Sequence, residues 1–108
     1  MGAIILAVEP RIKTAIIDSG GLAGGRSLPE VDQINYVSRV TIPVLMLNGR
    51  FDFYGPTAIS QEPLFRLLGS PTEHKRRVVY ETSHSIPRNE MIKEVVDWMD
   101  KYWGPTLR

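Results

Sequence analysis

The segment IPVLMLNGRFD, residues 42–52, decides the fold. Residues 44–47 are apolar at every position, without alternation between apolar and polar side chains. A strand that is apolar on both faces is typical of a parallel sheet that helices cover on each side. The polar stretch that follows begins with Asn48 and Gly49, and Asp52 comes three residues later. The segment therefore predicts a buried parallel strand with a carboxylate just past its end.

Two more strands are expected on either side of this one in the sequence. Residues 12–17 form a run rich in β-branched side chains that stops at the sequence Asp-Ser-Gly-Gly of residues 18–21. Residues 78–80 are a third short apolar run. The four-residue run HKRR at 74–77 is interpreted as a polar turn before that third strand.

Helices are expected between and after the strands. Residues 88–103 carry an apolar stripe at helical spacing, formed by Met91, Ile92, Val95, Trp98, Met99 and Tyr102. Residues 57–68 also fit a helix, in which Pro63 either causes a kink or marks the true start. Residues 3–8 fit the end of a buried helix, and residues 30–37 admit a short one within the irregular stretch 20–43.

This alternation of elements predicts one fold class. Strands that alternate with helices connect in parallel, so we expect an α/β fold with three parallel strands and flanking helices. The 108 residues suit a single small domain, and 43% hydrophobic residues suffice for a core. No repeat or linker divides residues 1–108.

Composition excludes several function classes. The net charge is only +1, from 13 basic and 12 acidic residues, so the chain lacks the field that attracts nucleic acid or an anionic membrane. It has no cysteine, which excludes disulfides, thiolate metal sites and a cysteine nucleophile and fits a cytoplasmic location. The apolar run near the N-terminus is too short to span a membrane and lacks the basic flank of a signal peptide.

Asp52 and His84 are the candidate catalytic residues. Each follows a predicted strand, and they lie 84 − 52 = 32 residues apart, which leaves room for one helix and one strand between them. Functional groups of open parallel sheets collect beyond the carboxyl ends of the strands. A carboxylate placed there can accept the His Nδ1–H and orient the imidazole as a general base. Taken singly, an Asp can instead close a turn and a loop His can be structural.

These residues carry a resemblance to a family. Residues 42–52, with Pro56 after them, resemble the acid-bearing strand and turn of α/β-hydrolases. Ser83-His84 and the amphipathic helix that follows resemble the family's terminal histidine loop and last helix. The match is best with esterase- and peptidase-like members, the relatives of dienelactone hydrolase and acetyl-xylan esterase. The resemblance implies ester or acyl-bond hydrolysis in which a Ser attacks, His84 takes its proton and Asp52 orients His84.

The chain departs from the family in lacking a nucleophile. No Ser stands in a Gly-x-Ser-x-Gly motif, and the segments that form the oxyanion hole are missing as well. We therefore expect a partial domain, the C-terminal half of the fold, that is inactive alone and acts on a small ester when an N-terminal half completes it. Ser19 follows a strand but lacks a Gly two residues before it, so it makes a weak substitute nucleophile.

A non-catalytic role is the alternative. A half fold leaves an open strand edge at residues 12–17, and open edges pair with other chains. We expect a homodimer through this edge, which under the alternative is the function itself: a dimerising or binding module.

No cofactor or metal is expected. The glycine-rich stretch at residues 20–25 matches no complete phosphate-binding motif, because Arg26-Ser27 follows where a P-loop needs Gly-Lys-Ser/Thr. His74 and His84 lie ten residues apart without the carboxylates that would complete a metal site.

Overall fold

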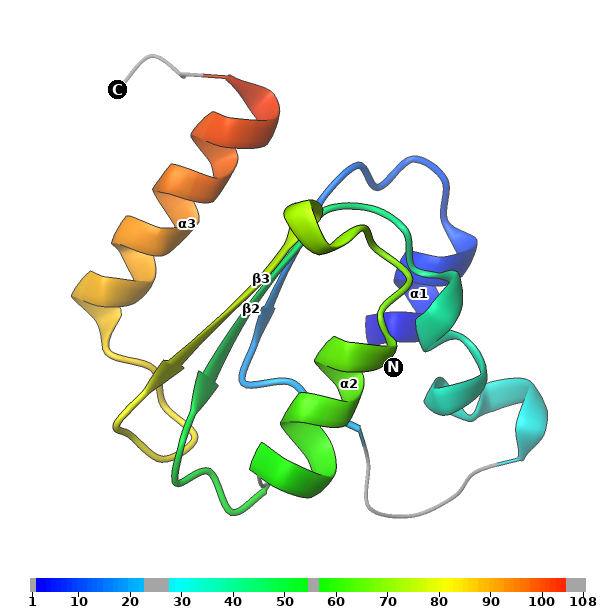
Figure 1. Cartoon of the computed structure of the whole chain (residues 1–108), viewed down its shortest axis with the longest axis horizontal. Coiled ribbons are helices and arrows are strands. Elements are labelled where there is room, and N and C mark those ends of the chain that lie inside the picture. The colour runs from blue at the N-terminus through cyan, green and yellow to red at the C-terminus, as the bar shows by residue number, and fades with distance from the viewer. Residues whose placement is uncertain (1, 23–27, 55–56, 105–108) are drawn as a thin grey trace.

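A computed structural model describes residues 2–22, 28–54 and 57–104. Three strands, β1 (Ala15–Asp18), β2 (Val44–Gly49) and β3 (Lys75–Tyr80), form one parallel sheet in the order β1-β2-β3. Three α-helices flank it, namely α1 (Gly2–Val8), α2 (Glu62–Leu67) and α3 (Arg88–Trp103). The predicted α/β class with three parallel strands and flanking helices is confirmed (Figure 1).

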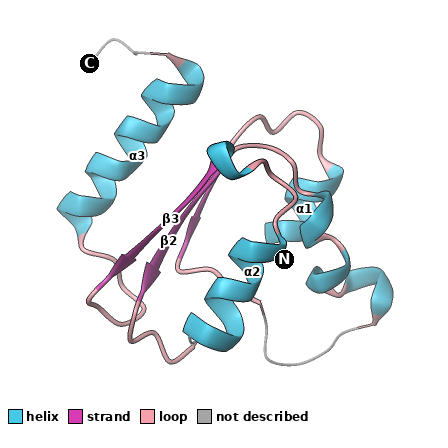
Figure 2. Ribbon diagram, in the orientation of Figure 1, coloured by secondary structure: helices cyan, strands magenta, loops and turns pink. Residues whose placement is uncertain are grey.

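The sheet separates two layers of helices. Helices α1 and α2 lie on one side and α3 stands on the other, as Figure 2 shows. The two sides have separate cores, because side chains alternate between the faces of a strand. Val44 and Met46 of β2 point into the core on the α1 and α2 side, whereas Leu45 and Leu47 pack with Trp98 of α3. All six residues of β2 are buried, as the apolar run at 44–47 predicts.

Strand β1 is shorter than the predicted strand at 12–17, and its limits differ at both ends. The ladder with β2 begins where the Ala15 N–H donates to the Pro43 carbonyl at 3.0 Å. One residue pair earlier in the ladder, the Lys13 carbonyl would have to accept an N–H from residue 43. Residue 43 is a proline, which has no N–H. Residues 12–14 therefore stay outside the strand, while Asp18 joins it opposite Leu47.

Strand β3 is longer than predicted, and the interpretation of residues 74–77 as a polar turn is wrong for three of the four. His74 lies in a 3₁₀ turn, but Lys75, Arg76 and Arg77 pair with β2 as part of the strand. Each basic side chain has a partner. Lys75 Nζ donates to carbonyls at the end of α2, and Arg76 contacts Glu94 of α3 at 3.2 Å. Partners on both sides of the sheet thus compensate for placing charge in this strand.

The helices lie where they are expected, with differences in the segments 57–68 and 30–37. Helix α3 has the predicted bounds, and Pro63 lies in the first turn of α2, so it marks a start rather than a kink. A π-helical turn, Thr57–Gln61, precedes α2. The predicted short helix at 30–37 is replaced by three 3₁₀ turns, at Pro29–Val31, Gln33–Asn35 and Val37–Arg39. The glycines at 24 and 25 and the proline at 56 lie outside the described residues.

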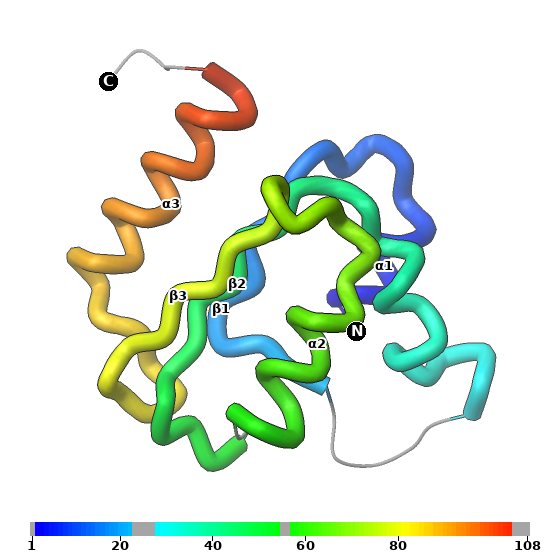
Figure 3. The backbone as a smooth tube through the Cα atoms, in the orientation of Figure 1, coloured from blue at the N-terminus to red at the C-terminus, as the bar shows by residue number. Residues whose placement is uncertain are grey.

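The backbone trace places the ends of the strands where a site can form. Each of the three strands ends at the same edge of the sheet, since they run parallel (Figure 3). The turns that follow β1, β2 and β3 begin at Ser19, Arg50 and Glu81. Residues far apart in sequence can therefore meet at this edge.

Candidate active site

The turns after β2 and β3 are tied together by main-chain hydrogen bonds. Arg50 N–H donates to the Tyr80 carbonyl at 2.8 Å, and Phe51 N–H donates to the Thr82 carbonyl at 3.0 Å. Gly49 permits this approach, because a Cβ at residue 49 would overlap the main-chain oxygens of Thr82 and Ser83. The two turns thus form one unit, which carries both Asp52 and His84.

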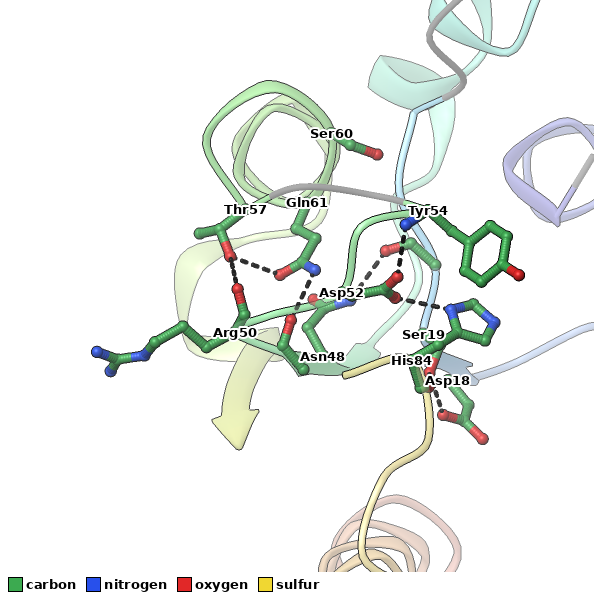
Figure 4. A network of polar contacts seen from close by, with 12 residues as sticks. Asp18, Ser19, Asn48, Arg50, Asp52, Tyr54, Thr57, Ser60, Gln61 and His84 are labelled. Atoms are coloured by element: carbon green, nitrogen blue, oxygen red, sulfur yellow. Dashed lines mark hydrogen bonds and ion pairs between the residues drawn. The ribbon is translucent and has the colours of Figure 1, made fainter. Parts of the chain in front are cut away.

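Asp52 and His84 meet within this unit. The His84 Nδ1 and the Asp52 Oδ2 lie 2.7 Å apart, and the other carboxylate oxygen accepts the Tyr54 N–H at 2.9 Å (Figure 4). The Asp52 side chain is 1% exposed, whereas that of His84 is 51% exposed. The carboxylate is therefore buried and held on both oxygens, while the imidazole faces outward.

This arrangement allows one kind of chemistry. A carboxylate that accepts from Nδ1–H fixes the tautomer in which Nε2 carries no proton. That Nε2 can then take a proton from a hydroxyl and stabilise it on an imidazolium facing a carboxylate. The geometry brings together the two residues that the sequence singles out, in the relation that an acid and a base require.

Aromatic side chains border the imidazole. The Tyr54 ring meets the His84 ring edge-on, with the centroids 5.1 Å apart, and Phe53 stacks on Tyr54 at 4.4 Å. Phe53 and Tyr54 are 73% and 74% exposed. The outward side of the pair is consequently lined by apolar surface that is open to solvent.

Ser19 lies at this site but in another relation to His84. Its Oγ is 2.5 Å from the main-chain oxygen of His84 and 3.0 Å from the Asp18 Oδ1. A hydroxyl has one proton, so it donates to one of these acceptors at a time. Ser19 also has a φ of +58°, a left-handed conformation that is uncommon for a non-glycine residue. The Ser19 hydroxyl thus engages the main chain of the histidine turn and not the imidazole.

Three residues of the site were not singled out from the sequence. Asn48, Gln61 and Arg77 connect beneath the Asp52 turn through their polar side chains (Figure 4 shows the first two). Asn48 and Gln61 are 0% and 1% exposed. Burial lowers the pKa of Arg77 from its ordinary value, and the Glu62 carboxylate opposes that shift. The available signals were an arginine directly before the apolar run at 78–80 and a glutamine within the helix expected at 57–68.

The other residues considered for ligand binding have partners within the chain. The His74 Nδ1 lies 3.0 Å from the Tyr102 hydroxyl, at α3 and not near the turn that carries His84. The Gly20 carbonyl accepts from Asn48, and the Leu22 N–H donates to the Ser60 carbonyl. Within residues 2–22, 28–54 and 57–104, no cluster of three or more His, Cys, Asp or Glu side chains could hold a metal.

None of the helices in the described part of the chain combines the length and the apolar character needed to cross a bilayer.

Comparison with known proteins gives matches in structure only. No family model matches the chain, and no curated protein matches it significantly. Among solved structures, a cold-adapted esterase from an Arctic intertidal metagenomic library matches with a TM-score of 0.71 and 28% identity, in its native and zinc-bound forms. TT1662 from Thermus thermophilus matches with a TM-score of 0.71 and 19% identity, which shows the fold alone.

These matches cover nearly all of this chain but half or less of each known protein. The alignment takes in 94% of this chain but only 43% of the esterase, and 97% of this chain but 50% of TT1662. The chain therefore spans half or less of the length of the proteins that it resembles. Its fold is that of part of an α/β-hydrolase.

Proposed function

We propose that this chain is the acid- and base-bearing part of a serine hydrolase that cleaves ester or related acyl bonds. The observation that carries the proposal is the 2.7 Å contact between His84 Nδ1 and the buried Asp52 carboxylate, at the carboxyl ends of adjacent parallel strands. The esterase that shares the fold supports it. In this role Asp52 orients His84, and His84 takes the proton of a serine hydroxyl.

The nucleophile is proposed to come from outside residues 1–108. No Ser of the chain stands in a Gly-x-Ser-x-Gly motif, and Ser19 Oγ contacts a main-chain oxygen of His84. A nucleophile needs its hydroxyl directed at the base and oxyanion donors beside it. The chain alone is therefore expected to be inactive, and a small ester becomes its substrate only when an N-terminal half completes the site.

The chain alone can be tested with a fluorophosphonate probe that labels activated serines. We expect the intact mass to remain unchanged after treatment, with circular dichroism showing that the protein is folded. A stoichiometric mass increase that His84→Gln abolishes, but the control His74→Gln does not, would place the nucleophile within these residues instead. His74 is a suitable control because it contacts Tyr102 and not Asp52.

The hydrolase proposal itself is tested in a longer polypeptide that joins this chain to an N-terminal half bearing a nucleophile elbow. His84→Gln should reduce kcat on a p-nitrophenyl ester by about 10³-fold or more, since members of a triad act as a unit. His74→Gln should leave kcat within about twofold in the same polypeptide, because that ring is remote from the reaction. Equal activity of both variants would refute a catalytic role for His84.

A second candidate function, assembly, rests on the open edge of β1. Within the ladder, residues 15, 17 and 19 direct their N–H groups toward β2, so those of Ile16 and Asp18 point to the opposite side. That side is where a second copy would pair to form a homodimer with a continuous sheet. The edge is short, at four residues, and Asp18 is exposed on it.

The dimer is tested by removing one outward N–H. Asp18→Pro deletes that donor without breaking a bond to β2, whereas Asp18→Asn retains it. If two copies pair through β1, light scattering should show a dimer for the native chain and Asp18→Asn, and a monomer for Asp18→Pro. A monomer for the native chain at tens of micromolar would exclude this mode of assembly.

A further inference from the structure

Arg77 is a charged residue placed inside the fold, on the side of the sheet away from α3. It pairs with Met46 across the ladder, and its side chain is 13% exposed. Arg76, its neighbour on the same strand, is 58% exposed and reaches Glu94 on the opposite face. Taking a guanidinium out of water is costly unless hydrogen bonds compensate it. The burial of Arg77 thus calls for specific partners.

Those partners are two buried side-chain amides. Arg77 Nε donates to Asn48 Oδ1 at 3.1 Å, and its Nη2 donates to Gln61 Oε1 at 2.7 Å. The planar guanidinium presents these donors in a fixed fork, so it sets the positions of both amides at once. Because their oxygens accept from Arg77, the NH₂ groups of both amides are directed to other acceptors.

Each amide, held by Arg77, donates its own hydrogen bond to one turn of the site. Gln61 Nε2 donates to the Gly49 carbonyl at 3.0 Å, and that same carbonyl accepts the N–H of Asp52 at 3.3 Å. The turn that carries the carboxylate is therefore held by Gln61. Figure 4 shows Gln61 beside this turn.

The second amide reaches the turn after β1. Asn48 Nδ2 donates to the Gly20 carbonyl at 2.9 Å, immediately after Ser19. Ser19 Oγ in turn lies 2.5 Å from the main-chain oxygen of His84. The connection therefore runs from Arg77 through one amide to the acid and through the other, by way of Ser19, to the base.

We propose that Arg77 is a positioning residue that fixes the relative placement of Asp52 and His84 through Gln61 and Asn48. It touches neither residue of the pair through a described hydrogen bond, so its effect is transmitted by the two amides. This inference rests on the proposed function, since it assigns Arg77 a part in the same acid–base pair. Its consequence is that loss of the guanidinium loosens the Nδ1 contact and lets the neutral imidazole adopt its other tautomer.

The test reads the tautomer of His84 directly in the isolated chain. Long-range ¹H–¹⁵N spectra, recorded where the imidazole is neutral, distinguish a proton on Nδ1 from one on Nε2, and His74→Gln assigns the two histidines. The native chain should show the Nδ1–H form at His84. Arg77→Gln should shift the majority to Nε2–H, Arg77→Lys should fall between, and the matched control Arg76→Gln should match the native chain.

A second variant separates positioning from a loss of folding. Gln61→Glu keeps the oxygens that accept from Arg77 and Thr57 but removes the donor to the Gly49 carbonyl. It should move the His84 tautomer in the same direction as Arg77→Gln. If Arg77→Gln folds and retains the native tautomer of His84, the positioning role is overturned. If Arg77→Gln does not fold, the same result for folded Gln61→Glu overturns it. If the native chain itself lacks Nδ1–H at His84, the acid–base pair of the proposed function fails instead.

Discussion

The main-chain oxygen of Ser83 occupies the space that a Cβ at Gly49 would need. This contact joins the turn after β3 to the end of β2, and it brings His84 over the strand that leads to Asp52. A single methyl group at residue 49 would therefore separate the two turns. Residue 49 must be a glycine because two backbone segments approach each other closely there, and not because of its own backbone conformation.

Gly49→Ala is accordingly expected to destabilise the protein by about 2 kcal/mol or more, because inserted volume meets backbone atoms that cannot move aside cheaply. Urea unfolding followed by circular dichroism measures the loss. Gly2→Ala is the control, since a Cβ there meets nothing within 4 Å. A change at Gly49→Ala no larger than that of the control would contradict the close approach.

Lys75 is expected to stabilise the end of α2. Its Nζ donates to the carbonyls of Phe65 and Leu68 at 3.0 and 3.2 Å, which are orphan acceptors at a helix C-terminus. Lys75→Met should therefore lower the free energy of unfolding by about 1–2 kcal/mol. Lys93→Met, on the exposed face of α3, should change it by less than about 0.5 kcal/mol. The same denaturation experiment compares them, and equal effects would rule out the cap.

The hydrogen bond from Trp98 to Thr14 should anchor α3 to the sheet. Trp98 Nε1 donates to Thr14 Oγ1 at 2.8 Å, and Trp98 is only 4% exposed. Thr14→Val keeps the shape but removes the acceptor, so a buried N–H loses its partner at a cost of about 1–3 kcal/mol. Thr14→Ser retains the oxygen and should recover most of this. Thermal unfolding monitored by tryptophan fluorescence reports the difference; matched melting temperatures for the two variants would count against the anchor.

The hydroxyl of Tyr80 is expected to make the folded protein less stable at alkaline pH. Burial, followed by the charges of Glu94 and Glu90, raises the pKa of its hydroxyl above the ordinary 10.0, while Arg76 opposes this. A raised folded-state pKa contributes stability that is present below the unfolded value and is lost as pH rises through the folded value. The free energy of unfolding should therefore decline above about pH 10. Tyr80→Phe should reduce that decline.

The same variant tests the state of the Tyr80 hydroxyl near neutral pH. Within the described residues its oxygen is buried without a hydrogen-bond partner. Removing an unsatisfied group is neutral or favourable, so Tyr80→Phe should raise stability by up to about 1 kcal/mol. A clear loss of stability in urea unfolding at neutral pH would indicate that the hydroxyl does make a bond.

Much of the fold was accessible from the sequence because its signals are local. The apolar run at 44–47 predicts a strand buried on both faces, and the stripe at 88–103 predicts α3 with its bounds. The strand limits were not accessible, since Pro43 acts on β1 across the sheet. The place of Lys75–Arg77 in a strand depends on partners in α2, in α3 and in the turn Thr57–Gln61, none of which a local sequence pattern reveals.

The candidate site, too, could be predicted from the sequence only in part. Asp52 and His84 could be named from their places after two strands, and the structure brings them together. The fold that carries them is shown by the comparisons, whereas their catalytic role stays a prediction. Asn48, Gln61 and Arg77 escaped sequence reasoning because each is defined by a long-range contact between polar groups.

The division of the hydrolase between two parts, as proposed above, has a consequence for how a completed enzyme would fail. Asp52 and His84 belong to one edge of this chain, where Arg50 is bonded to Tyr80 and Phe51 to Thr82. With the serine supplied from outside residues 1–108, the proton would pass between the two parts of the fold. A part that docks on this chain would also stabilise it, so poor docking would lower the melting temperature as well as slow proton transfer. A variant that loses turnover but keeps the melting temperature of the completed protein would therefore be impaired in its chemistry and not in its docking.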